Sequence, residues 1–390
     1  MEINEIQDYL VKHELDGWLM ADFHGRNTVA IATLGIKGML TRRSFYFIPV
    51  DGEPIAVVHA IEKEKFGNLP GTLYAYSSYR QLEAKLKDML SIAYRVAMEY
   101  SPKGRLPYIG LVDAGTIELV RECGVEIVSS ADLVARFQAR LEAEQIALHR
   151  MAARNLIEIK DLAFGFIADA LNENRKITEY DVCQFMREQF ETYDMETSSG
   201  PNCSVDAHAG DPHYEPSEEG SAEIKRGQLV LLDIWAKVKH EQGIYGDITW
   251  MGFAGTKDEI PEKYVRTFEV LTAARDKAVA FLRENIEKQP VYGYEVDDVC
   301  RGVVNAAGYG DNFTHRTGHS ITTSEHGTGP NIDNLETEDR RKLQKGHLFS
   351  IEPGIYLPEY GLRTEIDVLI GHDGVEVTTL PLQTEIQPLF

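Results

Sequence analysis

Five side chains with metal-binding chemistry lie in the last part of the chain, each in or beside an apolar segment. They are four carboxylates and one imidazole: Asp233, Asp247, His319, Glu352 and Glu365. The segments around them, such as RGQLVLLDIW and IYGDITWMGF, are typical of buried strands. Burying an ionised carboxylate without a partner is so costly that several together indicate compensating positive charge. Lys and Arg are scarce in these segments, which favours metal cations as the compensation.

Strand alternation predicts that the two aspartates share one face of a hairpin. Asp233 belongs to an alternating series whose members point to one buried face: Leu229, Leu231, Asp233 and Trp235. Asp247 follows two glycines and indicates the return strand, with Thr249 on its own face. If the strands pair, Asp233 and Asp247 repel each other unless a cation or a shared proton lies between them. Taken alone, Asp233 is equally compatible with an aspartate that ends a strand and caps a turn.

The two glutamates also interrupt strand patterns. Glu352 precedes Pro353, which favours an extended backbone, so Glu352 is expected at a strand end. In GLRTEIDVLI, alternation places Arg363, Glu365 and Asp367 on one face and apolar residues on the other. A solvated edge strand has the same pattern, so this segment alone does not distinguish a metal site from a charged surface.

Histidines supply the remaining chemistry. His319 lies between His315 and His326, and imidazole nitrogen is a common ligand of first-row divalent ions, although a lone histidine is often a core or surface residue. The seven-residue step from His319 to His326 excludes a shared helix face and the HExxH pattern. We therefore expect the two histidines to play different roles, one as a ligand and the other as a hydrogen-bond donor.

The donor set is rich in oxygen, which argues against copper and against structural zinc. Two divalent ions bridged by carboxylates about 3.5–4 Å apart would balance four negative charges and lower the pKa of a shared water. The chemistry predicted from the residues is therefore hydrolytic.

The elements that position these residues belong to the second of two expected domains, because 390 residues exceed one ordinary core. The first third alternates helical and strand patterns, including an expected strand over residues 105–115, and predicts an α/β domain without a nucleotide-binding or nucleophile motif. Helix formers run almost continuously from Ala131 to Leu171. We place the boundary near Arg140, giving domains 1–140 and 141–390, the second of them α+β.

Local signals mark the helices of the second domain. Thr178 and Asp181 predict a capping box, and Pro261 a first-turn proline that opens a long helix. Two strand-rich stretches follow long helices, which is compatible with a duplicated half, although no strong residue-level repeat accompanies it.

Composition restricts the partners. A formal charge of −22 disfavours nucleic acid, and no segment has the ~20 apolar residues that a membrane helix needs. Four separated cysteines form no CxxC pair, which fits reduced thiols. The N-terminal segment lacks the basic and apolar regions of a signal peptide. We expect a soluble, cytoplasmic protein.

The order Asp, Asp, His, Glu, Glu, within GHSITTSEH, SIEPGIY and GLRTE, resembles the family of aminopeptidase P, prolidase and methionine aminopeptidase. The resemblance covers essentially the whole chain. It implies a creatinase-type N-terminal domain followed by a pitta-bread metallopeptidase domain, a peptide substrate and a homodimer. It also implies two divalent metal ions per chain, with manganese first and cobalt, zinc or iron as alternatives.

Carried over by position, the resemblance implies a role for each residue. Asp233 would bind one metal, His319 and Glu352 the other, and Asp247 and Glu365 would bridge both. Glu352 would also be the general base. His326 and His213, the latter within DPHYEP, would contact the substrate, and the implied reaction is cleavage between an N-terminal residue and proline in a dipeptide or a longer peptide.

Several positions depart from the family pattern. The family's GHGIG is GHSIT here, Gly327 replaces an acid after His326, and the loop between Asp233 and Asp247 is longer by three residues. These changes leave all five ligands intact and concern the substrate pocket. The alternatives are a non-peptidase enzyme of the same fold, either a creatinase-like amidinohydrolase or a metal-dependent lyase, and a non-catalytic interaction protein.

Overall fold

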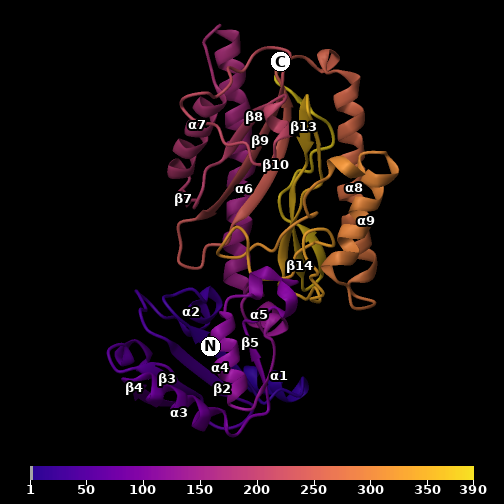
Figure 1. Ribbon diagram of the computed structural model, residues 1–390. Coiled ribbons are helices and arrows are strands. Elements are labelled where there is room, and N and C mark those ends of the chain that lie inside the picture. The colour runs from indigo at the N-terminus through magenta and orange to yellow at the C-terminus, as the bar shows by residue number, and fades with distance from the viewer. Residues whose placement is uncertain (1–2) are drawn as a thin grey trace. The chain divides into compact units, whose positions relative to one another are not determined.

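The computed structural model describes residues 3–390, and the chain divides into two compact units, Met1–Gln138 and Ala139–Phe390. Figure 1 shows the first unit in indigo to magenta and the second in magenta to yellow. The first unit has one mixed sheet with helices on both faces, and the second combines helices with mainly antiparallel strands. The expected α/β domain followed by an α+β domain is confirmed.

The sheet of the first unit has the strand order β4-β3-β2-β1-β5-β6. Strands β1–β2 and β2–β3 pair antiparallel, and the other neighbours pair parallel. Its strands are β1 (Gly17–Asp22), β2 (Ser44–Pro49), β3 (Ile55–His59), β4 (Thr72–Tyr76), β5 (Arg95–Met98) and β6 (Glu126–Ser129). Its helices are α1 (Ile3–Lys12), α2 (Thr28–Leu34), α3 (Tyr79–Leu90), α4 (Ala114–Glu122) and α5 (Ala131–Phe137).

Alternation along β1 explains how helices cover both faces of this sheet. Trp18 and Met20 pack with α1, α2 and α5, whereas Leu19 and Ala21 pack with α3 and α4. Each of these side chains is buried, so both faces of the central strand gain apolar burial.

The prediction of a strand over residues 105–115 is wrong. The chain there forms a short 3-10 turn, Pro107–Ile109, and the start of α4, while a second 3-10 turn, Pro102–Gly104, and the strand β5 come before it. Pro102 and Pro107 lack the amide donor that a strand ladder needs, while Leu106 and Ile109 are buried as isolated core residues. The apolar content of the segment therefore reflects core packing without a strand.

A buried carboxylate ties several of these elements together. Glu99, which follows β5, accepts hydrogen bonds from Trp18 Nε1 (2.7 Å), Asn27 Nδ2 (2.7 Å) and Ser130 Oγ (3.0 Å). These donors compensate its burial, and Glu99 has a structural role in the first unit.

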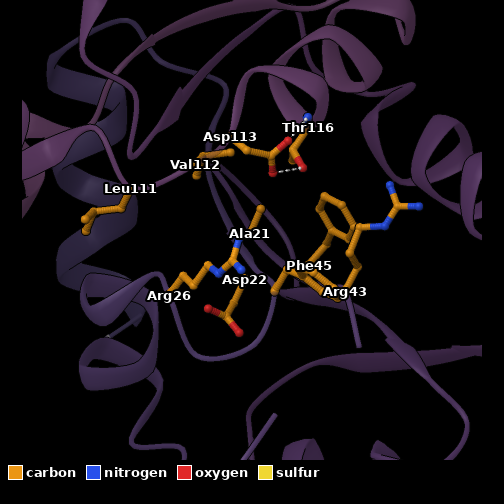
Figure 2. A pocket seen from close by; sticks show the side chains of 10 residues that line it. Ala21, Asp22, Arg26, Arg43, Phe45, Leu111, Val112, Asp113 and Thr116 are labelled. Carbon is orange, nitrogen blue, oxygen red and sulfur yellow. Dashed lines mark hydrogen bonds between the residues drawn. The ribbon is translucent and has the colours of Figure 1, made fainter. Parts of the chain in front are cut away.

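A pocket lies in the first unit, and Figure 2 shows its lining side chains. Asp22 accepts from the backbone amides of Gly25 and Asn27, both at 2.9 Å, and Asp113 accepts from the Thr116 hydroxyl at 2.7 Å. Both carboxylates of the pocket therefore stabilise local turns and helix starts. None of the candidate metal ligands lines it.

The second unit contains two pairs of helices, each followed by strands, as the sequence suggested. Figure 1 shows α6 and α7 on one side and α8 and α9 on the other, with strands between them. The helices are α6 (Ala143–Asn172), α7 (Glu179–Thr192), α8 (Glu262–Asn285) and α9 (Gly293–Ala306). The capping box of Thr178 and Asp181 is confirmed at the start of α7. Pro261 is the N-cap of α8, one position before the first-turn position expected.

The strands of this unit form three sheets. The largest has the order β16-β10-β9-β7, with β8 also paired to β9; the others are β11-β14-β15 and β12-β13. Their bounds are β7 (Met195–Glu196), β8 (Asn202–Val205), β9 (Leu229–Val238), β10 (Gly246–Phe253), β11 (Leu348–Ile351), β12 (Gly354–Leu357), β13 (Tyr360–Arg363), β14 (Ile366–Gly371), β15 (Gly374–Val377) and β16 (Gln387–Pro388).

Two apolar clusters lie on opposite faces of the β9–β10 hairpin. Val230, Leu232 and Ile234 pack with α6 and α7, and Leu229 and Leu231 pack with α8 and α9. The series containing Leu229 and Leu231 continues to Asp233, so the aspartate is on the face toward β13, with which β9 also makes contact. The hairpin therefore carries its carboxylates into the interior of the unit.

Within residues 3–390, no helix has the length and apolarity needed to cross a membrane. The four cysteines, all within this range, are free thiols, and Cys183, Cys203 and Cys300 are buried.

Candidate metal centre

The β9–β10 hairpin places Asp233 and Asp247 on one face. The strands pair antiparallel, and the register sets Thr249 opposite Asp233 and Trp235 opposite Asp247. The aspartates are therefore diagonal neighbours, two positions apart in register and on the same side of the hairpin. The amide of Asp247 donates to Asp367 Oδ2 at 2.9 Å, which fixes the backbone at this point.

Three of the predicted ligands form one buried group. Asp247, His319 and Glu365 each present a ligand atom, and these atoms all lie within 4.8 Å of one another. Asp247 comes from β10, His319 from the segment before β11, and Glu365 from the break between β13 and β14. Segments far apart in sequence thus converge on one point.

His319 directs one ring nitrogen toward the carboxylates. Its Nδ1 lies 3.3 Å from the Ser320 carbonyl, to which it donates, so Nε2 carries the lone pair. Nε2 lies 3.5 Å from Asp247 Oδ2 and 3.5 Å from Glu352 Oε1. Burial lowers the pKa of His319 to about 3, which keeps the ring neutral. A neutral imidazole oriented by a carbonyl is the arrangement of a metal ligand.

Glu352 joins this group through His319 and a serine. Ser350 Oγ accepts from the His319 amide at 3.0 Å and donates to Glu352 Oε1 at 3.1 Å. The Glu352 amide donates to the Thr317 carbonyl at 2.7 Å. Its side chain is 13% exposed, so it lies at the accessible side of the buried group.

Asp233 is connected to the group through Thr249. Thr249 Oγ1 lies 2.8 Å from Asp233 Oδ1 and 2.8 Å from Glu365 Oε2. Arg363 donates to Thr249 Oγ1 at 2.8 Å and forms an ion pair with Asp233 Oδ2. The structure thus brings all five predicted side chains to one place.

The protonation of these carboxyls fits a cation site. A threonine hydroxyl has one proton, yet Thr249 lies at hydrogen-bond distance from two carboxyl groups, so a protonated Glu365 would satisfy the second contact when no cation is near. Burial raises the pKa of both Asp247 and Glu365 well above the usual range, and the neighbouring carboxylates raise it further. Divalent cations would replace these protons, and the carboxylate and imidazole donors suit them.

The two histidines expected at the substrate side differ in position. The rings of His326 and His319 are 4.3 Å apart between centroids, and the His326 side chain is 52% exposed, so it borders the group from outside. His213 is exposed in the segment between β8 and β9, and only its backbone amide has a described partner, Asp211 Oδ1 at 3.0 Å. The structure therefore places His326 beside the centre but gives His213 no contact with it.

Another histidine, His208, is held by a buried carboxylate in the segment that carries His213. Glu179 is buried and lies 2.9 Å from His208 Nδ1, and its other oxygen accepts from the Tyr214 hydroxyl. The His208 ring stacks on Tyr214 at 4.1 Å. These contacts tie the segment to Glu179, the first residue of α7.

Sequence reasoning missed the role of Arg363. It placed this residue on the same face as Glu365 and Asp367 and left open a solvated edge strand, but all three side chains are buried. The segment is also two strands, β13 and β14, rather than one. A basic residue alternating with two acids on one strand is the signal that was available, because buried charges occur in compensating sets.

A hydrogen-bonded chain extends from Arg363 to His315. Arg363 Nη1 donates to Tyr356 Oη at 3.2 Å, and Tyr356 Oη lies 2.8 Å from His315 Nε2. His315 Nδ1 lies 2.7 Å from the Arg316 carbonyl and must donate to it, so Nε2 accepts from tyrosine. Burial and the nearby arginine lower the pKa of His315 to about 4, consistent with this neutral tautomer.

The family comparison agrees with this geometry. The model of metallopeptidase family M24 matches residues 149–372, a range that contains all five candidate ligands. The chain belongs to metallopeptidase family M24. Its second unit is the M24 pitta-bread catalytic domain, and divalent metal binding is a property of M24 enzymes.

Individual relatives of this M24 chain are distant. An uncharacterized peptidase of Staphylococcus saprophyticus is 27% identical over 205 residues, covering 52% of this chain and 53% of that protein. The chain spans about half the length of the curated relatives it matches.

Solved structures match the fold along the length of the chain. The dipeptidase PepE from Mycobacterium ulcerans has a TM-score of 0.77 at 20% identity, covering 99% of this chain and 96% of that chain. An X-prolyl aminopeptidase from Caenorhabditis elegans, described as a cytosolic enzyme with a di-nuclear active site, has a TM-score of 0.68 at 17% identity, covering 98% of this chain and 62% of that chain.

Proposed function

We propose that this M24 metallopeptidase is a dinuclear enzyme that cleaves the peptide bond between an N-terminal residue and proline. The observation that carries the proposal is the buried group of Asp247, His319 and Glu365, with Asp233 and Glu352 on its two sides. Four carboxylates and one imidazole would neutralise and ligate two divalent ions, and manganese suits such an oxygen-rich set.

Each candidate ligand has a proposed place. Asp247 and Glu365 would hold both ions, because they are the most central and most deeply buried carboxyls of the group. His319 and Glu352 would hold one ion, since Glu352 Oε1 lies 3.5 Å from His319 Nε2. Asp233 would hold the other, on the side of Thr249 and Arg363.

Divalent ions held by these residues would supply the chemistry that peptide hydrolysis requires, a polarised carbonyl and a water molecule of lowered pKa. Glu352 is the proposed general base, because it is the accessible carboxylate beside His319. His326 borders the centre, and burial lowers its pKa to about 4, so it is neutral near pH 7. It is proposed to donate a hydrogen bond to the oxygen that gains charge.

The proposal also assigns a substrate-binding residue and a product. His213 is proposed to approach the substrate from the exposed segment between β8 and β9. The dipeptidase and X-prolyl aminopeptidase among the structural neighbours support an N-terminal residue as the product. We also propose a cytoplasmic location, a homodimer and a domain boundary near Arg140. The C. elegans enzyme is itself described as cytosolic.

A matched peptide set tests the reaction. The manganese-loaded protein is incubated with Ala-Pro, Ala-Pro-Ala and Ala-Ala-Ala, and the released alanine is quantified. Cleavage of one or both proline peptides, with Ala-Ala-Ala resistant, is the expected result, and the two proline peptides separate a dipeptidase from an aminopeptidase. Equal cleavage of Ala-Ala-Ala would overturn the requirement for proline. No cleavage of any peptide would overturn the peptidase assignment and favour another chemistry on this fold.

A further inference from the structure

Glu325 is a carboxylate beside the metal centre that none of the proposed metal assignments uses. It directly precedes His326 in the segment after His319. Its side chain is 22% exposed, compared with 5% for His319 and 6% for Asp247. Glu325 is therefore less enclosed than the central ligands and accessible from solvent.

Glu325 lies next to His326 at the border of the central group. The His326 ring lies 4.3 Å from the His319 ring between centroids, and its Nε2 lies 3.6 Å from Glu325 Oε1. Glu325 also interacts electrostatically with Asp233 and Glu352, and its side chain, at 22% exposed, is more exposed than theirs, at 18% and 13%. Glu325 therefore lies on the solvent side of these candidate ligands, beside the more exposed His326.

Glu325 has little positive charge to compensate it. His326 is its ionic neighbour, but burial lowers the pKa of His326 to about 4, so that ring is neutral near pH 7. The described contacts of Lys237, from β9, are with other residues. Its Nζ donates to the Thr323 carbonyl at 2.9 Å and lies 3.7 Å from Glu196 Oε1. Burial, followed by the carboxylates of Asp233 and Glu352, raises the pKa of Glu325 to about 7. A cation at this place would favour the ionised form.

Neighbouring residues hold this carboxylate and add acceptors. The Ser199 side chain is hydrogen-bonded to Glu325, and Ser199 Oγ accepts from Trp235 Nε1 at 3.1 Å. Farther along the same segment, Asn202 pairs in register with Asp233, and its buried Oδ1 has no hydrogen-bond partner. This side of the centre therefore presents oxygen acceptors that a cationic ligand can use.

We propose that Glu325 is a specificity-determining residue that binds a basic side chain on the first residue of the substrate. The inference rests on the proposed cleavage after an N-terminal residue. The α-ammonium of such a substrate lies two bonds from the scissile carbonyl carbon, whereas a lysine ammonium reaches about 6 Å beyond the α-carbon. The position of Glu325, on the solvent side of the candidate ligands, matches the longer reach. Lys-Pro and Arg-Pro peptides are therefore preferred over peptides with an uncharged first residue.

The test separates ligand binding from catalysis. Calorimetry measures the dissociation constants of L-lysinol and L-norleucinol, which differ in the terminal ammonium and contain no scissile bond. The protein is used as wild type, Glu325→Gln, Glu325→Asp and Glu284→Gln, with the bound metal quantified in every sample. Glu284 is an exposed residue of α8 and serves as the matched control. The ratio of kcat/KM for Lys-Pro to that for norleucine-Pro is measured in parallel.

We expect wild type and Glu284→Gln to bind lysinol at least ten times more tightly than norleucinol. Glu325→Gln is expected to reduce this ratio to about one at unchanged metal content, and Glu325→Asp to retain part of it. Equal binding of both ligands by the wild type, or a preference that survives Glu325→Gln, would overturn the proposal. An equal loss of affinity for both ligands in Glu325→Gln would overturn it in favour of α-ammonium binding. Because the amino alcohols are not cleaved, these outcomes are independent of whether the wild type hydrolyses Xaa-Pro peptides.

Discussion

The guanidinium of Arg363 forms an ion pair with Asp233 inside the catalytic unit, where the two side chains are 9% and 18% exposed. The same guanidinium donates to Thr249 Oγ1 at 2.8 Å and to Tyr356 Oη at 3.2 Å. Arg363 thus fixes one candidate metal ligand directly and contacts the threonine that adjoins a second, Glu365.

Arg363→Met tests this positioning role. Removing the guanidinium leaves Asp233 without its ion pair and Thr249 without a donor, so the candidate ligand is less well oriented. Loss of an outer partner of a metal ligand typically costs 10–100-fold in metal affinity or activity, and we expect about that loss in manganese affinity. Calorimetric titration of manganese into the stripped protein measures it. An unchanged affinity would show that Asp233 is not held by Arg363 for metal binding.

Glu352→Ala is expected to remove both a ligand and the general base. Turnover of the proline peptide that the wild type cleaves should fall by several orders of magnitude, while the protein remains soluble and folded. Glu359→Ala, an exposed glutamate between β12 and β13, is the matched control and should be near normal. Near-normal turnover of Glu352→Ala would reject its assignment.

His326→Ala separates a hydrogen-bond donor from a metal ligand. The variant should retain its metals, because His319 and the carboxylates are intact, and should lose about 10²–10³-fold in kcat if His326 stabilises the developing oxyanion. Bound metal and kcat are measured on the same sample. A loss of metal in this variant would make His326 a ligand instead.

A pH dependence of stability follows from His149. Its Nδ1 lies 2.8 Å from the Tyr245 carbonyl, and burial lowers its pKa to about 4. Because the folded-state pKa is below the ordinary value of 6.5, the unfolded chain binds more protons between these pH values. The free energy of unfolding should therefore fall as pH is lowered through this window, by about 3 kcal/mol from this group.

His149→Gln should reduce this pH slope in metal-free protein. Denaturant unfolding of the second unit at several pH values between 4 and 7 measures the slope, and His240→Gln, at an exposed position, is the control. The pKa of His315 is also lowered to about 4, so part of the slope should remain. An identical slope in wild type and His149→Gln would contradict the assignment of a buried, neutral His149.

Sequence patterns predicted the β9–β10 hairpin because strand alternation follows directly from a buried face. They placed Asp233 and Asp247 on the same side, and the observed register agrees. Alternation did not reveal the break at Thr364 and Glu365 or the burial of Arg363, since both depend on contacts with strands far away in the sequence. Glu325 was missed for the same reason. Its neighbour His326 is adjacent in sequence, but Ser199 and Asp233 approach it only in the fold.

The central claim is that this chain uses two divalent ions for hydrolysis, and a metal titration tests it most directly. Manganese is added stepwise to chelator-stripped protein, and bound metal per chain and hydrolysis of Ala-Pro and Ala-Pro-Ala are measured on each sample. We predict about two ions per chain at saturation, no activity without metal and activity that rises with metal occupancy. Binding of no metal, or hydrolysis that is independent of metal occupancy, would contradict the dinuclear mechanism.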